Sequence, residues 1–596
     1  MSNILKYTFA MLFSVLLAGC SDEASNPPAP TPEPEPEEII KNGSLKGTII
    51  GTEWSVDYNN GNSITDQVNV KECVFDGKFN TFFASYLRSG TWVGLDLGEK
   101  HIITKIGYSP RINQPTRVQL AIIEGANKED FSDAVPIHII KEAGEENKMN
   151  YADINCSKGF RYVRYIGPND ARCNLAELAF YGQKGEGDDS QFYQLTNLPT
   201  VVINTKDAED ITSKEKEIPS VVYIISEGGK KILATEETGV RGRGNASWLY
   251  PKKPYRLKFD KKQQVLDAPA KAKKWTLINN YGDKTLMRNI LAFELSRRIG
   301  LAYTPYCHPV DVVLNGEYKG CYQLCDQIEV NENRVNITEM EPEDLALPAL
   351  SGGYLIEIDA YAKNETSYFI SNSDIPVTIK SPDDEDIVSV QSAYIKEFFN
   401  AMEAAVFAYN YDDEENGYRK YLDLDSFLKH FIVGELSGNT DTYWSVYMYK
   451  DRNSDKLYTG PVWDFDLAFE NDQRTYPINS LDDYIYATLG SVASSSVRDL
   501  VNVIVKDDEA SRIRLAELWN TARTEKGIDE ASLLAYVDQT AELLDESQTL
   551  NFLRWKIMNE KIQQNPVIHG SYKAEVEAIK TYLKQRLPKM DYLIGK

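Results

Sequence analysis

The stretch from residue 47 to residue 182 constrains the fold most, because short β-like runs follow one another there, each broken by glycine, asparagine or proline. Two of these runs, residues 92–97 and 160–165, alternate apolar side chains with others. This period of two is typical of strands with one buried face. A succession of such strands predicts a β-sandwich or jelly roll.

The chain is long enough for several domains, since its 596 residues are about four times the ~150 of a typical domain. Its 42% hydrophobic and 11% aromatic content excludes a mostly disordered chain. The net charge of −24 repels phosphate backbones, so we expect no nucleic-acid partner. The five scattered histidines do not favour a zinc site or a Ser-His-Asp triad. They are His101, His138, His308, His430 and His569.

An apolar run at residues 9–18 is too short to span a bilayer and indicates a secretory signal, residues 1–19. The signal ends in Leu-Ala-Gly before Cys20, which resembles a bacterial lipobox whose cysteine is lipidated. A plain secretory signal with a chance cysteine is the alternative. Residues 21–23, Ser-Asp-Glu, resemble the acidic export signal of surface lipoproteins in some Gram-negative bacteria. We therefore expect a lipoprotein anchored in the outer membrane through acyl chains on Cys20, facing the cell exterior.

Two polar segments are expected to be linkers. Residues 20–44 carry a Pro/Glu run that favours extended polyproline II and predicts a stalk. Residues 184–194 are expected to connect two globular units. Cys321 and Cys325 would lie ~13 Å apart in a strand, too far for a mutual bridge. The cysteines other than Cys20 are too few for a disulfide scaffold. They are Cys73, Cys156, Cys173, Cys307, Cys321 and Cys325.

Five motifs occur in order through the first domain: VFDGK at 74–78, WVGLDLG at 92–98, IGYSPR at 106–111, YVRY at 162–165 and AELAFYG at 176–182. In this order they resemble the discoidin, or coagulation factor type C, family. The resemblance implies a galactose-binding-like jelly roll over residues 45–183, which often binds carbohydrate through loops at one end. A glycan is therefore an expected partner, with Arg88, Trp92 and Arg111 as candidate contacts. Trp92 suits the core better than a sugar platform.

The same resemblance implies a structural Ca²⁺ near the DG motif. Asp76, Thr81 and Glu177 match positions that supply hard oxygen ligands. Lys78 stands where an acidic residue is common, and its charge would oppose a cation. The alternative is a carboxylate that caps a turn.

A cationic strand follows a glycine-rich run in the second half of the chain. Residues 241–248 read RGRGNASW, and residues 255–259 alternate three apolar side chains with Arg256 and Lys258. Glycines permit close backbone approach to an anion. The segment predicts a phosphate or carboxylate cradle; a solvated strand face is the alternative.

Further along, residues 283–298 have apolar residues at helical spacing and predict a helix that ends before Gly300. Glu294 lies in this helix, and a lysine paired with a helix glutamate is a familiar way to orient a phosphate-binding lysine. The Asn-Gly pair at 315–316 predicts a hairpin after the strand at 310–314.

Two aspartates, Asp464 and Asp466, lie among aromatic residues, and a third, Asp441, follows a turn-like Gly-Asn-Thr run. If the chain is extended at residues 464–466, two carboxylates face the same way ~6.6 Å apart. Carboxylates at that spacing beside a third suit a divalent cation. Among aromatic neighbours they need partners or metal to be tolerated.

The motifs of this half are GRGNASW at 242–248, KKPYRLKF at 252–259, LMRN at 286–289, LNGEYKG at 314–320, GGYLIEID at 352–359 and GPVWDFD at 460–466. Their order resembles the CotH kinase-like family, named for spore-coat protein H. The resemblance implies an atypical protein-kinase-like fold over residues 195–510, with residues 511–596 as its C-terminal helical part, and ATP with Mg²⁺ or Mn²⁺ as cofactors. The whole chain is then an α+β multidomain protein, a jelly roll followed by a kinase-like domain.

Carried over by position, the resemblance gives the aspartates separate roles. Asp441 accepts the proton of the substrate hydroxyl, and Asp464 binds metal with Asp466 as a second ligand or its support. A kinase catalytic loop supplies an asparagine for a second metal a few residues later. Residues 444–446 offer none here, so Asn439 is the candidate substitute.

For the phosphates, Lys258 is the expected lysine, with Lys253 and Arg256 as alternatives and Glu294 as the orienting acid. Two functions stay open: a kinase acting on protein hydroxyls, and a non-catalytic surface protein for glycan binding or adhesion. Glycoside hydrolysis by Asp464 with another carboxylate is a third, although no sugar-cleft pattern accompanies the pair. The acids and the cationic strand favour an anion and metal site, whereas a surface location favours binding.

Overall fold

The computed structural model describes residues 43–488, 490 and 493–595. From residue 43 onward the chain forms one compact unit. The expected signal peptide, Cys20 and nearly all of the 20–44 stalk lie outside the described residues. Among the helices that are described, none is both long and apolar enough to cross a membrane.

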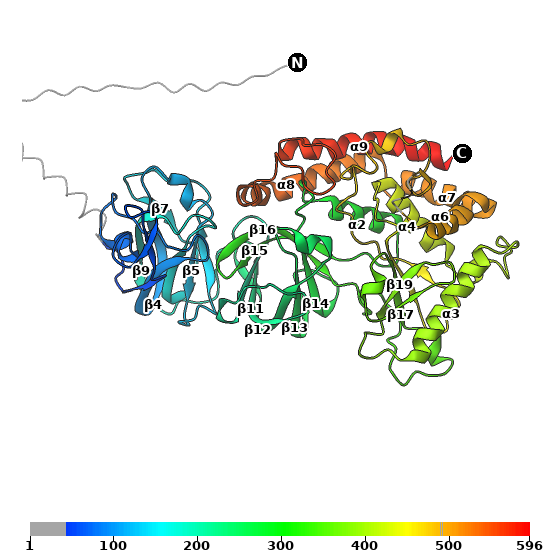
Figure 1. The fold of residues 1–596 in the computed structure, drawn as a ribbon, viewed down its shortest axis with the longest axis horizontal. Helices are drawn as coiled ribbons and strands as arrows, with labels where there is room; N and C mark the ends of the chain where they lie inside the picture. Colours follow the sequence, from blue (N-terminus) through cyan, green and yellow to red (C-terminus); the bar gives the residue numbers. More distant parts are fainter. Residues whose placement is uncertain (1–42, 489, 491–492, 596) are drawn as a thin grey trace, which may run out of the picture. The chain divides into compact units, whose positions relative to one another are not determined.

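The first part of the chain is a β-sandwich, as the strand pattern predicts (blue to cyan in Figure 1). Its long strand β4 shifts register between Asp96 and His101. The first half of β4 pairs with β1 and β8, and the second half pairs with β7 and β9. One strand thereby serves two layers, which enclose an apolar core. The strands are β1 (Thr48–Gly51), β4 (Trp92–Pro110), β5 (Ile122–Ala126), β6 (Val135–Ile139), β7 (Asn150–Asp153), β8 (Gly159–Ile166) and β9 (Leu175–Lys184), beside a β2–β3 hairpin (Ser55–Asp57, Ser63–Thr65).

A closed seven-stranded barrel follows (green in Figure 1). Its strands are β10 (Thr200–Thr205), β11 (Ile218–Ser226), β12 (Lys230–Gly242), β13 (Tyr255–Gln264), β14 (Lys271–Ile278), β15 (Cys307–Leu314) and β16 (Glu317–Asp326). Parallel pairing of β10 with β15 closes it. The alternation predicted for residues 255–259 is confirmed, because Tyr255, Leu257 and Phe259 are buried in the barrel core. The hairpin at 315–316 is also confirmed, since both residues have the positive φ that such turns require.

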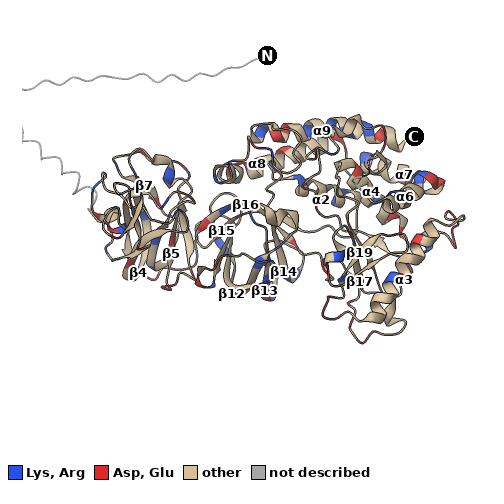
Figure 2. Cartoon of the chain, in the orientation of Figure 1, with Lys and Arg blue, Asp and Glu red and all other residues tan. Residues whose placement is uncertain are grey.

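A five-stranded antiparallel sheet and a set of helices complete the fold, so the α+β class is confirmed. Helix α8 packs on barrel strand β16 and α9 packs on α4, and Figure 2 shows Lys/Arg and Asp/Glu interspersed along α8 and α9. The strands are β17 (Tyr354–Asp359), β18 (Tyr368–Ile370), β19 (Pro376–Ser381), β20 (Ser445–Lys450) and β21 (Tyr458–Thr459). The helices are α2 (Arg288–Ile299), α3 (Ser389–Val406), α4 (Leu424–Ser437), α5 (Ile485–Thr488), α6 (Ser495–Asn502), α7 (Glu509–Glu525), α8 (Glu530–Arg554) and α9 (Tyr572–Ile594).

Helix α2 starts five residues later than the sequence pattern predicts. The carboxylate of Asp283 accepts hydrogen bonds from the backbone N–H groups of Thr285 and Arg288, at 2.9 Å each. Leu286 has φ +60°, which no α-helix contains. Asp283 therefore holds a turn ahead of the helix, while Gly300 ends it in the left-handed conformation as expected.

The segment expected to be a linker, residues 184–194, is hydrogen-bonded to both neighbours. Lys158 of the sandwich forms an ion pair with Asp189 at 2.8 Å, and Lys231 of the barrel pairs with the same carboxylate. An apolar cluster adds further contact between sandwich, barrel and α8. Its buried members are Leu120, Ile122, Ile139, Leu195, Val313, Tyr318 and Leu550.

Candidate functional site

A polar cleft of about 550 Å³ lies between the barrel and the second sheet. The barrel contributes the loop after β12, and the sheet contributes the ends of β17, β19 and β20. Asp441, Asp464 and Asp466 all line this one cleft. Its other charged lining residues are Arg243, Glu357, Asp359, Glu365, Lys380 and Arg474.

Asp441 is held at the cleft by the turn that follows α4. Gly438 ends the helix with φ +68°, and a Cβ at that position would lie 2.5 Å from the side chain of Ile478. Only glycine fits such a turn without displacing its neighbours. Arg474 then donates from Nη2 to Oδ1 of Asp441 at 3.2 Å. The backbone turn and Arg474 together fix the carboxylate.

Asp464 and Asp466 are placed by an irregular segment, so the extended chain expected there is wrong. Asp464 has φ +64°, an uncommon conformation for a residue other than glycine. Asn289 of α2 accepts a hydrogen bond from the N–H of Phe465 at 2.8 Å. Asn439 donates from Nδ2 to the backbone oxygen of Asp464 at 3.1 Å. Strained backbone held by side chains from other elements is common at functional sites.

Asn439 is buried and does not line the cleft. Its Oδ1 also accepts from the N–H of Asp441 at 3.4 Å. The amide therefore fastens the two acid-bearing segments to each other. This contact is structural, unlike the metal-ligand role expected from the sequence.

Asp441 raises the pKa of the other two carboxylates. Burial raises the pKa of Asp441, and Arg474 opposes that shift. Burial and then the charge of Asp441 raise the pKa of Asp464 to about 6. Burial and the charges of Asp464 and Asp441 raise the pKa of Asp466 well above its usual range. The burial that affects Asp464 comes from the surrounding cleft walls, because the side chain itself is exposed to the cleft and a ligand has access to it.

Arg243 is the cation that faces Asp464, rather than Lys258. Burial lowers the pKa of Arg243, and the charge of Asp464 opposes that shift. Its guanidinium lies 5.7 Å from the ring centre of Trp463. Within the described part of the chain no carboxylate lies within ion-pair distance of Arg243. The glycine-rich run therefore brings a cation to the cleft, although Arg243 was not among the cations chosen from the sequence.

Lys380 of β19 forms an ion pair with Glu357 of β17 at 3.1 Å, and both side chains line the cleft. Burial raises the pKa of Glu357 to about 7, and Lys380 opposes that rise. Tyr447 lies opposite Glu357 on β20. This pair was not predicted from the sequence, although a charged residue inside an apolar strand such as YLIEID is a signal of it.

The cations expected from the sequence point elsewhere. Arg256 and Lys258 both face Glu217, Lys258 at 4.0 Å. Lys253 donates to the backbone oxygen of Trp248 at 2.8 Å. None of the three lines the cleft. Arg256 and Lys258 sit on the outer face of the barrel because the apolar residues that alternate with them fill its interior, whereas Lys253 precedes the strand.

Glu294, the acid expected to orient a lysine, pairs instead within its own helix. It contacts Arg297 at 3.0 Å and Arg298 at 2.8 Å. Its distance of three and four residues from these arginines is enough to explain the pairs. The lysine–glutamate arrangement of the cleft is Lys380 with Glu357.

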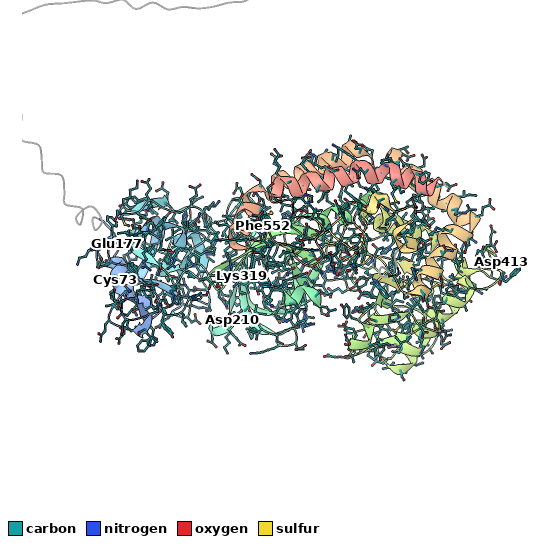
Figure 3. All side chains as sticks on the ribbon, turned by 45° about the horizontal axis from the view of Figure 1, so that its top comes forward. Cys73, Glu177, Asp210, Lys319, Asp413 and Phe552 are labelled. Carbon is teal, nitrogen blue, oxygen red and sulfur yellow. The ribbon has the colours of Figure 1, made fainter. Side chains whose placement is uncertain are left out.

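In the sandwich, Asp76, Thr81 and Glu177 are brought together (Glu177 is labelled in Figure 3). Thr81 donates to Asp76 at 2.8 Å, and the N–H of Lys78 donates to Asp76 at 2.8 Å and to Glu177 at 2.7 Å. Burial, followed by a hydrogen bond to Asp76, raises the pKa of Glu177 to about 8. Asp76 therefore caps the turn, which is the alternative to a Ca²⁺ ligand given in the sequence analysis. The adjacent carboxyls also suit a Ca²⁺ ion.

The candidate sugar contacts differ in exposure. Arg111 lies 3.8 Å from the ring centre of Phe82 and donates to Asn174 at 3.1 Å. Arg88 is exposed. Trp92 is partly buried and packs on Phe131 with ring centres 5.2 Å apart, which suits a packing role better than a sugar platform.

The sequence model of the family described as "CotH kinase protein" matches residues 240–590. The chain belongs to this CotH family. The match covers the loop that carries Arg243, all three cleft aspartates and the C-terminal helices. No curated protein matches the chain.

Solved structures are similar to about a quarter of this CotH-family chain. The module CBM62 from Clostridium thermocellum Xyl5A is 40% identical, covers 24% of this chain and 97% of its own, and has a TM-score of 0.22. A Clostridium perfringens module, CpGH89CBM32-5 in complex with GalNAc-β-1,3-galactose, is 17% identical over 23% of this chain and 94% of its own, with a TM-score of 0.19. A Streptococcus pneumoniae fucose binding module is 16% identical over 24% of this chain and 95% of its own, with a TM-score of 0.18.

The cleft of this CotH-family chain has a donor set that fits a divalent cation bound together with phosphates. Across residues 43–488, 490 and 493–595, no three His, Cys, Asp or Glu side chains form a complete metal cluster. Mg²⁺ does not require one, because one or two carboxylates with substrate phosphates and water usually bind it. Asp464 and Asp466 supply two oxygen donors whose raised pKa values a cation would lower.

Proposed function

We propose that this CotH-family chain is an atypical kinase that transfers a phosphoryl group from a metal-bound nucleotide to a protein hydroxyl. One observation carries the proposal: Asp441, Asp464 and Asp466 share a cleft with Arg243 and with the Lys380–Glu357 ion pair. Phosphoryl transfer depends on positioning and charge stabilisation, which call for such opposed charges.

Each side chain then has a task that its position supports. Asp464 and Asp466 would hold Mg²⁺ or Mn²⁺, which supplies charge neutralisation on the phosphates when bound. Arg243 and Lys380 contact phosphate oxygens, and Glu357 keeps Lys380 directed into the cleft. Asp441 accepts the proton of the attacking hydroxyl.

Transfer of label tests this proposal. The full chain is incubated with γ-labelled ATP, Mn²⁺ and a peptide library that contains Ser, Thr and Tyr. We expect labelled hydroxyls with the parent, and a loss of about 10²–10⁴-fold with Asp441→Asn, the range typical of a general base. Nucleotide binding should persist in that variant. Equal labelling by both proteins, or none by a parent saturated with nucleotide, would contradict the proposal.

A second candidate is a non-catalytic surface protein that binds glycans or mediates adhesion. A cluster at one end of the sandwich favours it, where Arg111 lies between the rings of Phe82 and Tyr58 and contacts buried Asn174. Flat aromatic surfaces with a few fixed polar groups suit a small polar ligand. Arg111→Ala should abolish binding to a galactose-containing glycan array, and an array that stays blank with the parent would leave the sandwich a structural role.

A Ca²⁺ ion at Asp76, Thr81 and Glu177 would stabilise this sandwich. We expect millimolar Ca²⁺ to raise its unfolding temperature, because an ion that binds only the folded state stabilises it by mass action. Glu177→Gln should remove the effect. A rise of equal size in that variant would place the ion elsewhere.

The location of the chain is proposed from its first residues. Acylated Cys20 would anchor it in the outer membrane, with the cleft and the sandwich outside the cell. Cys20→Ser should then move the protein from the membrane fraction to the soluble fraction. Persistence in the membrane fraction would defeat the lipoprotein proposal without affecting the kinase proposal.

A further inference from the structure

Two cysteines lie directly opposite each other in the barrel wall. Cys307 of β15 pairs with Cys325 of β16 in the antiparallel ladder. Cys321, the other cysteine of β16, lies opposite Asp311. The cysteines at 321 and 325 are thus separated along one strand, whereas 307 and 325 are cross-strand neighbours.

The hydrogen-bond pattern shows which kind of pair this is. The N–H of Asp311 donates to Pro199 at 2.9 Å, away from β16. Residues 307, 309 and 311 share that direction because a strand alternates, and proline at 309 has no N–H to donate. The N–H of Asp326 donates to Tyr306 at 3.0 Å, so the neighbouring pair is hydrogen-bonded. Cys307 and Cys325 therefore form a non-hydrogen-bonded pair, whose Cα atoms lie ~4.5 Å apart.

Both thiols lie on the outer face of the barrel. They pack into the core shared with the second sheet and α2, whereas Leu324, the residue before Cys325 on β16, fills the barrel interior. Cys325 is fully buried and Cys307 is partly exposed. Burial, and then a hydrogen bond to the thiol of Cys307, raises the pKa of Cys325. A Cα separation of 4.4–6.8 Å is the range in which disulfides form.

We propose that Cys307 and Cys325 are an oxidation site that forms a cross-strand disulfide when the protein meets a small or protein disulfide oxidant. The thiolate of Cys307, which solvent reaches, attacks one sulfur of the oxidant and releases the other as a thiol. Cys325 then gives up its proton and displaces the bound oxidant sulfur. Two protein thiols are oxidised to one disulfide, and one oxidant disulfide is reduced to two thiols.

The bond would fasten the barrel wall beside the cleft. Gln327, two residues after Cys325, lines the cleft, and Arg243 lies close enough to Cys325 for their charges to interact. The disulfide would close the loop from residue 307 to residue 325, and such a loop stabilises the folded state chiefly by restricting the unfolded chain. The proposal does not depend on kinase activity, because it concerns two thiols outside the acidic cleft.

Peptide mapping of the full chain tests the proposal. The protein is exposed to oxidised glutathione, alkylated without reduction and digested with trypsin. We expect residues 299–319 and 320–334 to be recovered as one linked species that carries one alkyl group, on Cys321, and is about 2 Da lighter than the sum of residues 299–319 as a thiol and residues 320–334 alkylated once. Because the second peptide holds both Cys321 and Cys325, fragmentation between them must place the link at Cys325. Reductant should lower the unfolding temperature of the oxidised protein by about 3–5 °C.

Four variants make the result decisive. Cys325→Ala and Cys307→Ser should each abolish the linked species, whereas Cys321→Ala should keep it. Cys73→Ser, in the sandwich (labelled in Figure 3), serves as a control of similar exposure and should also keep it. Full alkylation of Cys307 after oxidant treatment, or a link at Cys321, would overturn the proposal. If Cys325→Ala fails to fold, the parent's linked peptide and Cys307→Ser still decide the question.

Discussion

Arg474 joins Asp441 to a second, buried aspartate. Its Nη2 donates to Oδ1 of Asp441 at 3.2 Å, and its Nε donates to Oδ2 of Asp472 at 2.7 Å. Asp472 is fully buried and also accepts from the hydroxyl of Thr440. The carboxylate assigned as proton acceptor is therefore fixed by a network and not by its own backbone alone.

Replacement of Arg474 should disturb the position of the Asp441 carboxylate without weakening nucleotide binding. In Arg474→Gln we expect phosphoryl transfer to fall about 100-fold, since displacement of a catalytic group by ~1 Å has effects of that size. Stability should fall by about 1–3 kcal/mol, because Asp472 loses a charged partner. Nucleotide affinity should change little. A transfer rate equal to that of the parent would show that Asp441 needs no such support.

Lys380 and Lys258 offer a matched pair of lysine substitutions. Lys380→Met should weaken nucleotide binding about 10–100-fold, the value of a hydrogen bond from a charged donor. Lys258→Met should leave the affinity unchanged, because that side chain faces Glu217 on the outside of the barrel. Calorimetric titration with ATP and Mn²⁺ measures both. If Lys258→Met has the larger effect, the sequence-based assignment is right and Arg243 and Lys380 do not bind the phosphates.

His430 gives the fold a defined response to acid. It is 5% exposed and lines an apolar cavity of about 40 Å³, and burial lowers its pKa from 6.5 to about 4. Between these values the unfolded chain binds more protons than the folded one. Above pH 6.5 His430 is neutral in both states and does not lower the free energy of unfolding. As the pH falls from 6.5 towards 4, protonation of the unfolded chain at His430 lowers that free energy by about 3 kcal/mol.

Urea unfolding at pH 7 and pH 4 measures this effect. His430→Leu should lose less unfolding free energy over that interval than the parent, by about 3 kcal/mol. His569→Leu changes an exposed histidine and should behave as the parent does. Parallel curves for the parent and His430→Leu would show that other groups cause the acid sensitivity.

Local patterns predicted the framework of the fold well. The alternation at residues 255–259 and the Asn-Gly pair at 315–316 depend on neighbours in sequence, and both are found as expected. The three aspartates were also recognisable, because acids among aromatic residues are costly without a task. Discoidin-like and CotH-like motif orders located the sandwich and the second domain.

The partners of the acids were not predictable from spacing. Lys380 and Glu357 are brought together by the pairing of β19 with β17, a contact between strands that no local pattern specifies. Lys258 was chosen for its cationic strand, but strand alternation places it outside the barrel once its neighbours fill the interior. Asp464 adopts a left-handed backbone conformation, whereas the local sequence pattern predicts an extended chain.

Metal-dependent nucleotide binding is the decisive test of whether this cleft holds a metal and phosphates. Thermal unfolding of the parent with ATP at ~100 times its dissociation constant should show a gain of about 2.7 kcal/mol with Mg²⁺ or Mn²⁺, and little with ATP and a chelator. Asp464→Asn, which keeps the shape of the side chain and removes its charge, should lose the metal-dependent gain and remain folded. A gain that is unchanged in Asp464→Asn, or absent in the parent under all these conditions, would contradict a metal and phosphate site in this cleft.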